Sequence, residues 1–199
     1  GGDGFYNSSS TLIKINGRQA IIQGNQFFGQ HKNGAIHFNG VSLQAGHMID
    51  NNIVYLDNGH FVEKTGPGDI QAFKFTNNYI LVASSGDGQG AMIIRVPSNV
   101  PGGWQHARYC DNDIRVESNQ PHYLIDIRKT GFGYVCTGNQ LIVSGATSKG
   151  FYFEDSTGAV ITNNRFRTTG VGSFDGDPVE FGGFTSNIIV ANNHGFDFQ

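Results

Sequence analysis

The sequence predicts an all-β chain folded as a single-stranded parallel β-helix of about seven turns. The main observation is a set of seven asparagines in one context: an apolar residue lies three positions before each, and six of them have another two positions after. Their spacings are 27, 26, 34, 27, 25 and 29 residues, which suits a fold with fixed strands and variable loops. The second observation is that short alternating runs, typical of strands, recur between them without a helical pattern. The seven are Asn25, Asn52, Asn78, Asn112, Asn139, Asn164 and Asn193.

Two strands separated by a corner are predicted around each asparagine. The residues five and three positions before it are mostly apolar, as Phe73 and Phe75 are before Asn78, and residues two apart share one face of a strand. The apolar residue two positions after it has the other parity, so the backbone turns in between. Because asparagine tolerates the left-handed conformation that a one-residue corner requires, we expect it to occupy the corner itself. The clearest segments are 20–28, 73–81, 134–143 and 159–166.

The asparagine column has two interpretations. A row of side-chain amides is able to bind sugar, but stacked amides at a corner also hydrogen-bond to the turns above and below, as in other cross-β ladders. We expect the structural ladder.

A third strand in each turn is predicted from another alternating run upstream of the asparagine. These runs are 13–15, 36–38, 94–96, 125–127, 151–153 and 179–181. The segment 62–66 matches 127–131, since both end in Lys-Thr-Gly, which places Val62 in the column of Ile127 and supplies the missing run. Each strand type recurs once per repeat, so it stacks on its own copies in parallel.

A single domain spanning residues 1–199 is predicted, because one uninterrupted repeat fills the chain and no linker divides it. Only 38% of the residues are apolar while 29 are glycine, as expected for a narrow tube with many corners and loops. Neither terminus offers an amphipathic helix to cover an open end of the tube. We therefore expect the chain to be a fragment of a longer protein, or its ends to contact other domains or subunits.

Composition argues against several classes of partner. The net charge is −3 and no basic stripe is present, so nucleic acid is not expected as a ligand. No apolar run approaches the length of a membrane span. The seven histidines lack metal-ligand spacing, so we expect no metal and no cofactor. Cys110 and Cys136 point in different directions, and we expect free thiols, as in a protein folded in a reducing cytoplasm.

The phenylalanine, isoleucine and asparagine columns resemble the right-handed parallel β-helix of the pectate-lyase superfamily, in particular that of bacteriophage tailspikes. The resemblance covers nearly the whole chain. It implies the fold but no single activity, because this superfamily includes lyases, hydrolases, epimerases and non-catalytic adhesins. It also implies a homotrimer, as tailspikes of this fold usually are, and a location on the virion tail or outside the cell.

Candidate catalytic carboxylates lie on the outer face of the third strand, because side chains fill the interior of such a tube. Asp126 and Glu154 are on neighbouring turns, with backbones about 8 Å apart. Carboxylates separated by roughly 6.5–9.5 Å serve as acid and base in inverting glycosidases. We expect Asp126 and Glu154 to be a catalytic pair, with Glu180 as the alternative partner, unless this face is a set of solvated charges. The outward column is predicted to hold Lys14, His37, Phe61, Arg95, Asp126, Tyr152 and Glu180.

Candidate substrate-binding residues are Arg95, Arg128 and Tyr152 on this face, and Trp104 and His106 in the longest loop region. Arg95 lies next to Asp126, where it either forms a cross-strand charge pair or binds the carboxylate of a uronate or sialate. Trp104, the only tryptophan, either stacks on a sugar face or folds back onto the tube.

Three functions fit these observations, and the sequence leaves them open. The first is a phage tailspike-type domain that binds, and as a glycoside hydrolase also depolymerises, a bacterial surface polysaccharide. The second is a non-catalytic β-helical module that binds a glycan or joins domains. The third is a secreted polysaccharide lyase or epimerase, although a calcium cluster is not indicated because the dense acidic segments look like turns.

Overall fold

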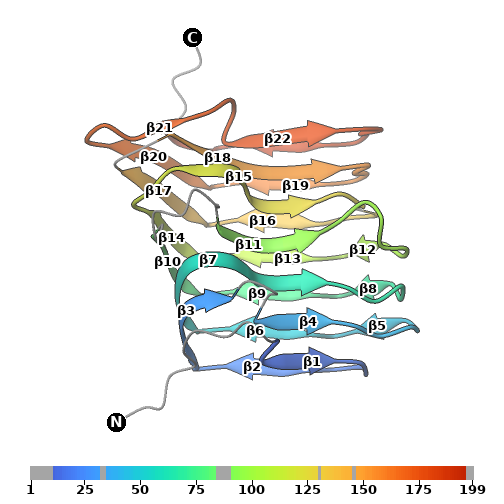
Figure 1. The fold of residues 1–199 in the computed structure, drawn as a ribbon. Coiled ribbons are helices and arrows are strands. Elements are labelled where there is room, and N and C mark those ends of the chain that lie inside the picture. Colours follow the sequence, from blue (N-terminus) through green and yellow to red (C-terminus); the bar gives the residue numbers. More distant parts are fainter. Residues whose placement is uncertain (1–10, 32–34, 84–90, 130, 145–146, 196–199) are drawn as a thin grey trace.

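The computed structural model describes residues 11–31, 35–83, 91–129, 131–144 and 147–195, and these form strands and turns without a helix. The strands wind into a parallel β-solenoid of about six turns, stacked from the N-terminal to the C-terminal end (Figure 1). The predicted all-β parallel β-helix is confirmed. All seven predicted repeats contribute a strand to one seven-stranded sheet, and seven stacked strands enclose about six complete turns.

The seven-stranded sheet contains the strand that leads into each asparagine, and its neighbours are parallel and in register. Its strands are β2 (Ile21–Gln23), β6 (Met48–Asp50), β9 (Lys74–Thr76), β13 (Arg108–Cys110), β16 (Val135–Thr137), β19 (Val160–Thr162) and β23 (Ile189–Ala191). A short three-stranded sheet precedes it in the second to fourth turns: β5 (Gln44–Ala45), β8 (Ile70–Gln71) and β12 (Trp104–Gln105).

A thirteen-stranded sheet forms the other two sides of the tube, and the long strand β7 (Ile53–Lys64) runs from one side to the other. The side after the asparagines contains β3 (Gln26–His31), β10 (Tyr79–Val82), β14 (Asp113–Val116), β17 (Gln140–Ser144) and β20 (Arg165–Thr169). The other side, called the β15 face below, contains β1 (Ile13–Ile15), β4 (Ile36–Phe38), the end of β7, β11 (Ala91–Val96), β15 (Gln120–Ile127), β18 (Thr147–Glu154) and β22 (Val179–Gly182). Strand β21 (Ser173–Phe174) pairs with the start of β18.

Inside the tube, equivalent positions of successive turns stack on one another. The central residues of β2, β6, β9, β13, β16 and β19 are in register and buried: Ile22, Ile49, Phe75, Tyr109, Cys136 and Ile161. Aromatic rings fill the wider turns, where Phe38, Phe73 and Trp104 meet edge to face. Each such ring pair contributes on the order of 0.5–1.5 kcal/mol beyond the area it buries.

All seven asparagines form the predicted ladder. The Asn112 side-chain oxygen accepts hydrogen bonds from the backbone N–H and the amide of Asn78, both at 3.0 Å. The Asn112 amide also donates to the Phe75 carbonyl of the preceding turn, at 3.0 Å. Equivalent bonds join every neighbouring pair from Asn25 to Asn193. The five central members are buried, so their amides hold the turns together and are not available to a sugar.

The expectation that the asparagine itself takes the left-handed conformation is wrong. The residue directly before it does so, because the asparagine must point inward to join the ladder. This preceding position holds only glycine, asparagine or aspartate: Gly24, Asn51, Asn77, Asp111, Gly138, Asn163 and Asn192. A second left-handed corner lies six residues before each asparagine, at Gln19, Gly46, Ala72, His106, Gly133, Gly158 and Asn187.

The predicted register of Val62 is also wrong by two residues. Val62 pairs with Ile94, not with the column of Ile127, so Glu63 takes the outward position that was assigned to Phe61. The cause is the bend in β7, where the successive residues Phe61 and Val62 are both buried and the simple alternation of a strand is interrupted. As a result Lys64, which follows the outward Glu63, occupies an inward position beside Phe38.

Candidate functional site

The candidate site is the outward column of the β15 face, which we call the polar column. Successive strands place its members in register, one per turn. They are Lys14, His37, Glu63, Arg95, Asp126, Tyr152 and Glu180. Six of these seven positions match the prediction. Because paired strands carry the column, neighbouring members are held about 4.8 Å apart at the backbone.

Glu63 is the buried carboxylate at the start of the charged part of the column. Its Oε1 atom accepts a hydrogen bond from Arg95 Nη1 at 2.8 Å, and Oε2 lies 3.5 Å from His37 Nε2. Glu63 is only 9% exposed, and this burial raises the pKa of its carboxyl group against the opposing effect of Arg95. Burial lowers the pKa of His37, and the positive charge of Lys14 adds to the effect.

Asp126 of β15 is held by Arg128, which directly follows the last residue of that strand. Arg128 donates from Nε to Oδ1 at 2.6 Å and from Nη2 to Oδ2 at 3.1 Å, a bidentate pairing that fixes both groups. The same guanidinium group lies 4.4 Å from the ring centroid of Tyr152 on the next turn. The hydrogen bonds to Asp126 raise the pKa of Arg128. Because Arg128 occupies both oxygens of Asp126, Arg95 pairs with Glu63, although Arg95 is next to Asp126 in register.

Two tyrosines extend this arrangement into a stack of two rings with a cation at each end. Tyr123 and Tyr152 stack with centroids 4.9 Å apart, and the Lys149 ammonium group lies 5.0 Å from the Tyr123 centroid. The Tyr123 hydroxyl donates to Glu180 Oε2 at 2.6 Å, and burial together with this contact raises the pKa of Tyr123. We call the series Lys149, Tyr123, Tyr152 and Arg128 the cation–tyrosine stack.

Glycine at position 182 gives Tyr152 its space. A Cβ atom at Gly182 would lie 1.8 Å from the Tyr152 hydroxyl oxygen, a distance at which the ring would have to move. Gly182 is in register with Glu154, so the tyrosine leans toward the end of the next strand.

The structure brings most of the predicted site residues onto one surface. Arg95, Asp126, Tyr152 and Glu180 belong to the polar column, while Arg128, directly after β15, and Glu154, the last residue of β18, each lie two positions beyond it. The carboxylates are not free, since Asp126 is bonded to Arg128 and Glu180 to Tyr123. Both bonds favour a positioning or binding role for these two carboxylates.

Trp104 and His106 lie elsewhere. Trp104 is fully buried, with its ring 4.7 Å from that of Phe73, so the indole folds into the tube and presents no face to a sugar. His106 is exposed at a left-handed corner between β12 and β13, away from the β15 face. Neither residue contributes to the polar column.

Three residues of the site were not found from the sequence. Glu63 was missed because of the bend in β7. Tyr123 and Lys149 were missed because the pairing of β15 with β18 shifts register between Gln120 and Tyr123, which hides their alignment. A search for an aromatic residue three positions before Asp126 and a cation three before Tyr152 would have identified both.

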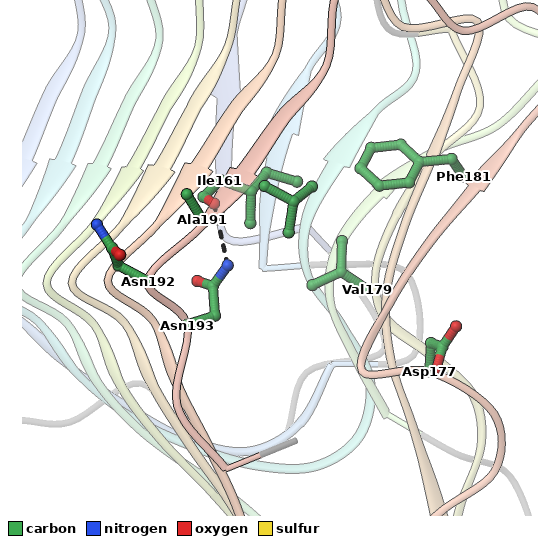
Figure 2. A pocket seen from close by; sticks show the side chains of 8 residues that line it. Ile161, Asp177, Val179, Phe181, Ala191, Asn192 and Asn193 are labelled. Carbon is green, nitrogen blue, oxygen red and sulfur yellow. Dashed lines mark hydrogen bonds between the residues drawn. The ribbon is translucent and has the colours of Figure 1, made fainter. Parts of the chain in front are cut away.

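A cavity of about 330 Å³ lies at the C-terminal end of the tube, on the inward side of β22. Figure 2 shows Phe181 at its wall and the Asn193 amide bonded to the backbone carbonyl of Ile161. Phe181 and Val190 are in register with the buried Phe153 and Ile161 of the preceding turn. The cavity is therefore where the interior of the tube ends, and it does not open onto the polar column.

No cluster of three or more histidine, cysteine, aspartate or glutamate side chains suited to a metal ion occurs in the described ranges. Those ranges also contain no helix that is long and apolar enough to cross a membrane. Cys110 and Cys136 are both free thiols.

Comparisons with protein-family models, with curated proteins and with solved structures find no match to this chain. The class that the structure defines is a parallel β-solenoid with a polar outer column. The likeness to tailspikes and to the pectate-lyase superfamily remains one of sequence pattern.

Proposed function

We propose that this chain binds a polysaccharide along the β15 face, as a β-solenoid domain of the phage-tailspike type that recognises a bacterial surface glycan. The observation that carries the proposal is the cation–tyrosine stack. It sets two partly exposed tyrosines of adjacent strands beside Arg128 and Lys149. Rings with a polar tip and fixed hydrogen-bonding groups suit a ligand that has both apolar faces and hydroxyl groups.

A binding test compares two tyrosines on different sides of the tube. Tyr152→Ala removes the centre of the stack, whereas Tyr79→Ala removes an exposed tyrosine of β10 that lies 5.6 Å from Arg115 in a similar cation–π pair. Wild type is first screened against a panel of capsule and O-antigen polysaccharides, and those that it binds are retained. The proposal expects Tyr152→Ala to bind these polysaccharides at least tenfold more weakly and Tyr79→Ala to bind them with an affinity close to that of wild type. Equal losses in both variants would contradict a site on the β15 face.

Hydrolysis is proposed as a second property of the same face, carried by Asp126 and Glu154. The bidentate hydrogen bonds from Arg128 fix the orientation of Asp126, and a general base has to be positioned toward the proton that it removes. Wild type, Asp126→Asn and Glu154→Gln are to be incubated with each retained polysaccharide, and the polymer size followed by chromatography. Shortening by wild type alone supports the pair, while shortening by both variants removes it.

Measurements on the same protein and polysaccharides distinguish the tailspike-type domain from the non-catalytic module and the lyase. The tailspike type implies a homotrimer on the virion tail, which light scattering after size-exclusion chromatography measures. Binding without shortening by a monomer favours the non-catalytic module. Shortening that produces ultraviolet-absorbing unsaturated ends, with stability that depends on calcium, favours the lyase.

A further inference from the structure

Glu63 and Asp126, two carboxylates of the polar column, are less exposed than the arginines that pair with them. In the Arg95–Glu63 pair the arginine side chain is 40% exposed and the glutamate side chain 12%. In the Arg128–Asp126 pair the values are 35% and 12%. In both pairs the group exposed to solvent is therefore mainly the guanidinium group, although the charges of each pair cancel.

Each guanidinium group is held in place yet keeps unused donors. Arg95 uses Nη1 on Glu63, and Arg128 uses Nε and Nη2 on Asp126 while its plane lies against Tyr152. A guanidinium group has five N–H donors, so each retains an edge directed away from its carboxylate. Fixing the group in advance lowers the entropy cost of binding a ligand there.

The two arginines are also close to each other. Arg95 is in register with Asp126, and Arg128 lies two residues beyond Asp126, directly after the end of β15, where its backbone N–H donates to the Val96 carbonyl at 2.9 Å. The strand rise and spacing place the two backbones about 8 Å apart. Two prepared guanidinium edges at this separation match neighbouring oxyanions, because planar carboxylates and tetrahedral phosphates or sulfates accept hydrogen bonds from arginine in pairs.

We propose that Arg95 and Arg128 form an oxyanion-binding site, which takes the carboxylate, sulfate or phosphate groups of an acidic glycan. Glu63 and Asp126 are then positioning residues that orient the arginines. The inference rests on the proposed function, since it names the ligand class of the same face. It differs from it in a testable way, because a neutral glycan would satisfy the proposed function alone.

The first experiment probes the arginines directly, without a polysaccharide. The Nε–H NMR signals of Arg95 and Arg128 are followed during titration with sodium sulfate, sodium phosphate and glucuronate, with sodium chloride as the salt control. Arg165 and Arg167, two exposed arginines of β20 on another side of the tube, serve as matched references. The proposal expects saturable shifts for Arg95 and Arg128 at anion concentrations at least tenfold lower than for the references. Equal responses from all four arginines would overturn it, and the most responsive anion identifies the group.

The second experiment uses acidic polysaccharides and the same polymers with their acidic groups esterified or removed. The double variant Arg95→Gln/Arg128→Gln is expected to lose at least tenfold more affinity for the acidic polymers than for the neutralised ones, for which only the contribution of Arg128 to the cation–tyrosine stack is lost. Arg165→Gln/Arg167→Gln is expected to bind as wild type does. If wild type binds acidic and neutralised polymers equally, the oxyanion site is refuted while the proposed function stands. If the arginine signals respond to anions but no polysaccharide is bound, the site stands and the proposed function fails.

The positioning role has its own readout. Glu63→Gln and Asp126→Asn retain the arginines but weaken the bonds that hold them. Glu63→Gln is expected to lower the affinity for sulfate or glucuronate at the Nε–H signal of Arg95, and Asp126→Asn at that of Arg128, while the Arg165 and Arg167 signals respond as in wild type. Unchanged anion affinity in both would assign the two carboxylates to another role.

Discussion

The ammonium group of Lys64 donates a hydrogen bond to the backbone carbonyl of Pro101, which lies 37 residues further along the chain. Lys64 also bonds the carbonyl of Gly66 at 2.8 Å and is fully buried at a position in register with Phe38. Through these hydrogen bonds a buried lysine connects the segment before Trp104 to the preceding turn, which contains Lys64 and Gly66. Burial lowers the pKa of Lys64 from 10.5 to about 8, against the opposing effect of Asp69.

This pKa predicts that the contribution of Lys64 to stability becomes more favourable in alkali. Between pH 8 and 10.5 the unfolded chain keeps the Lys64 proton while the folded chain loses it, so the free energy of unfolding rises with pH, by at most about 1.4 kcal/mol per unit. Urea unfolding at several pH values measures the slope. Tyrosines ionise in the same range, so the quantity to compare is wild type minus Lys64→Met. A difference that does not change with pH would contradict the expectation.

The ladder predicts a cost for removing one asparagine. Asn139→Ala leaves the Asn112 amide without its acceptor at 2.8 Å and the Tyr109 carbonyl without its donor at 2.7 Å. We expect a loss on the order of 1–2 kcal/mol in unfolding free energy, measured by thermal and urea denaturation. Asn119→Ala, at an exposed loop position, is the control and should change little. A melting temperature equal to that of wild type would show that the ladder hydrogen bonds of Asn139 do not contribute to stability.

The second corner predicts a stabilising substitution. Ala72 has a φ of 51°, where a side chain is strained, and the equivalent residue in three other turns is glycine. Ala72→Gly is expected to raise stability by roughly 0.5–1 kcal/mol, the strain relief exceeding the added entropy of the unfolded chain. Ala45→Gly, within β5, is the matched control and should lower stability by a similar amount. Destabilisation by both substitutions would refute the strain at Ala72.

His60 predicts a separate loss of stability in acid. Burial lowers its pKa from 6.5 to about 4, with smaller contributions from Arg95, His37 and His122. Between these values the unfolded chain binds a proton that the folded chain does not, so stability falls as pH falls from 6.5 to about 4. His60→Gln should show a shallower decline in urea midpoints over this interval. The control is His106→Gln, at an exposed corner whose equivalent in the first turn is Gln19. Its urea midpoint should decline with pH as that of wild type does.

The fold was predictable because its signals are local. Each asparagine and its apolar neighbours lie within about eight residues, and the parity change around them is visible in the sequence. The left-handed residue before each asparagine was misassigned, although a column of only glycine, asparagine and aspartate indicates it. The corner that holds Ala72 and His106 has no such composition, because contacts within the tube impose its conformation.

The site was only partly predictable, because its pairings depend on three-dimensional detail. The column of Arg95, Asp126, Tyr152 and Glu180 follows from strand register alone. That Arg95 turns to Glu63 and Arg128 to Asp126 depends on the bend in β7 and on side-chain conformations, which no periodicity encodes. The burial of Trp104 likewise depends on how its loop folds, and sequence offered both outcomes.

The ladder joins each turn only to the one above and the one below it, so cooperativity passes along the tube from neighbour to neighbour. Local opening is then easiest where a strand has a single partner, as β23 has only β19 among the described strands. Hydrogen–deuterium exchange should report this as a gradient, with the backbone amides of Asn78 and Asn112 the slowest to exchange and protection falling steadily toward Asn164. The rod would then open progressively from its ends instead of melting at one weak point.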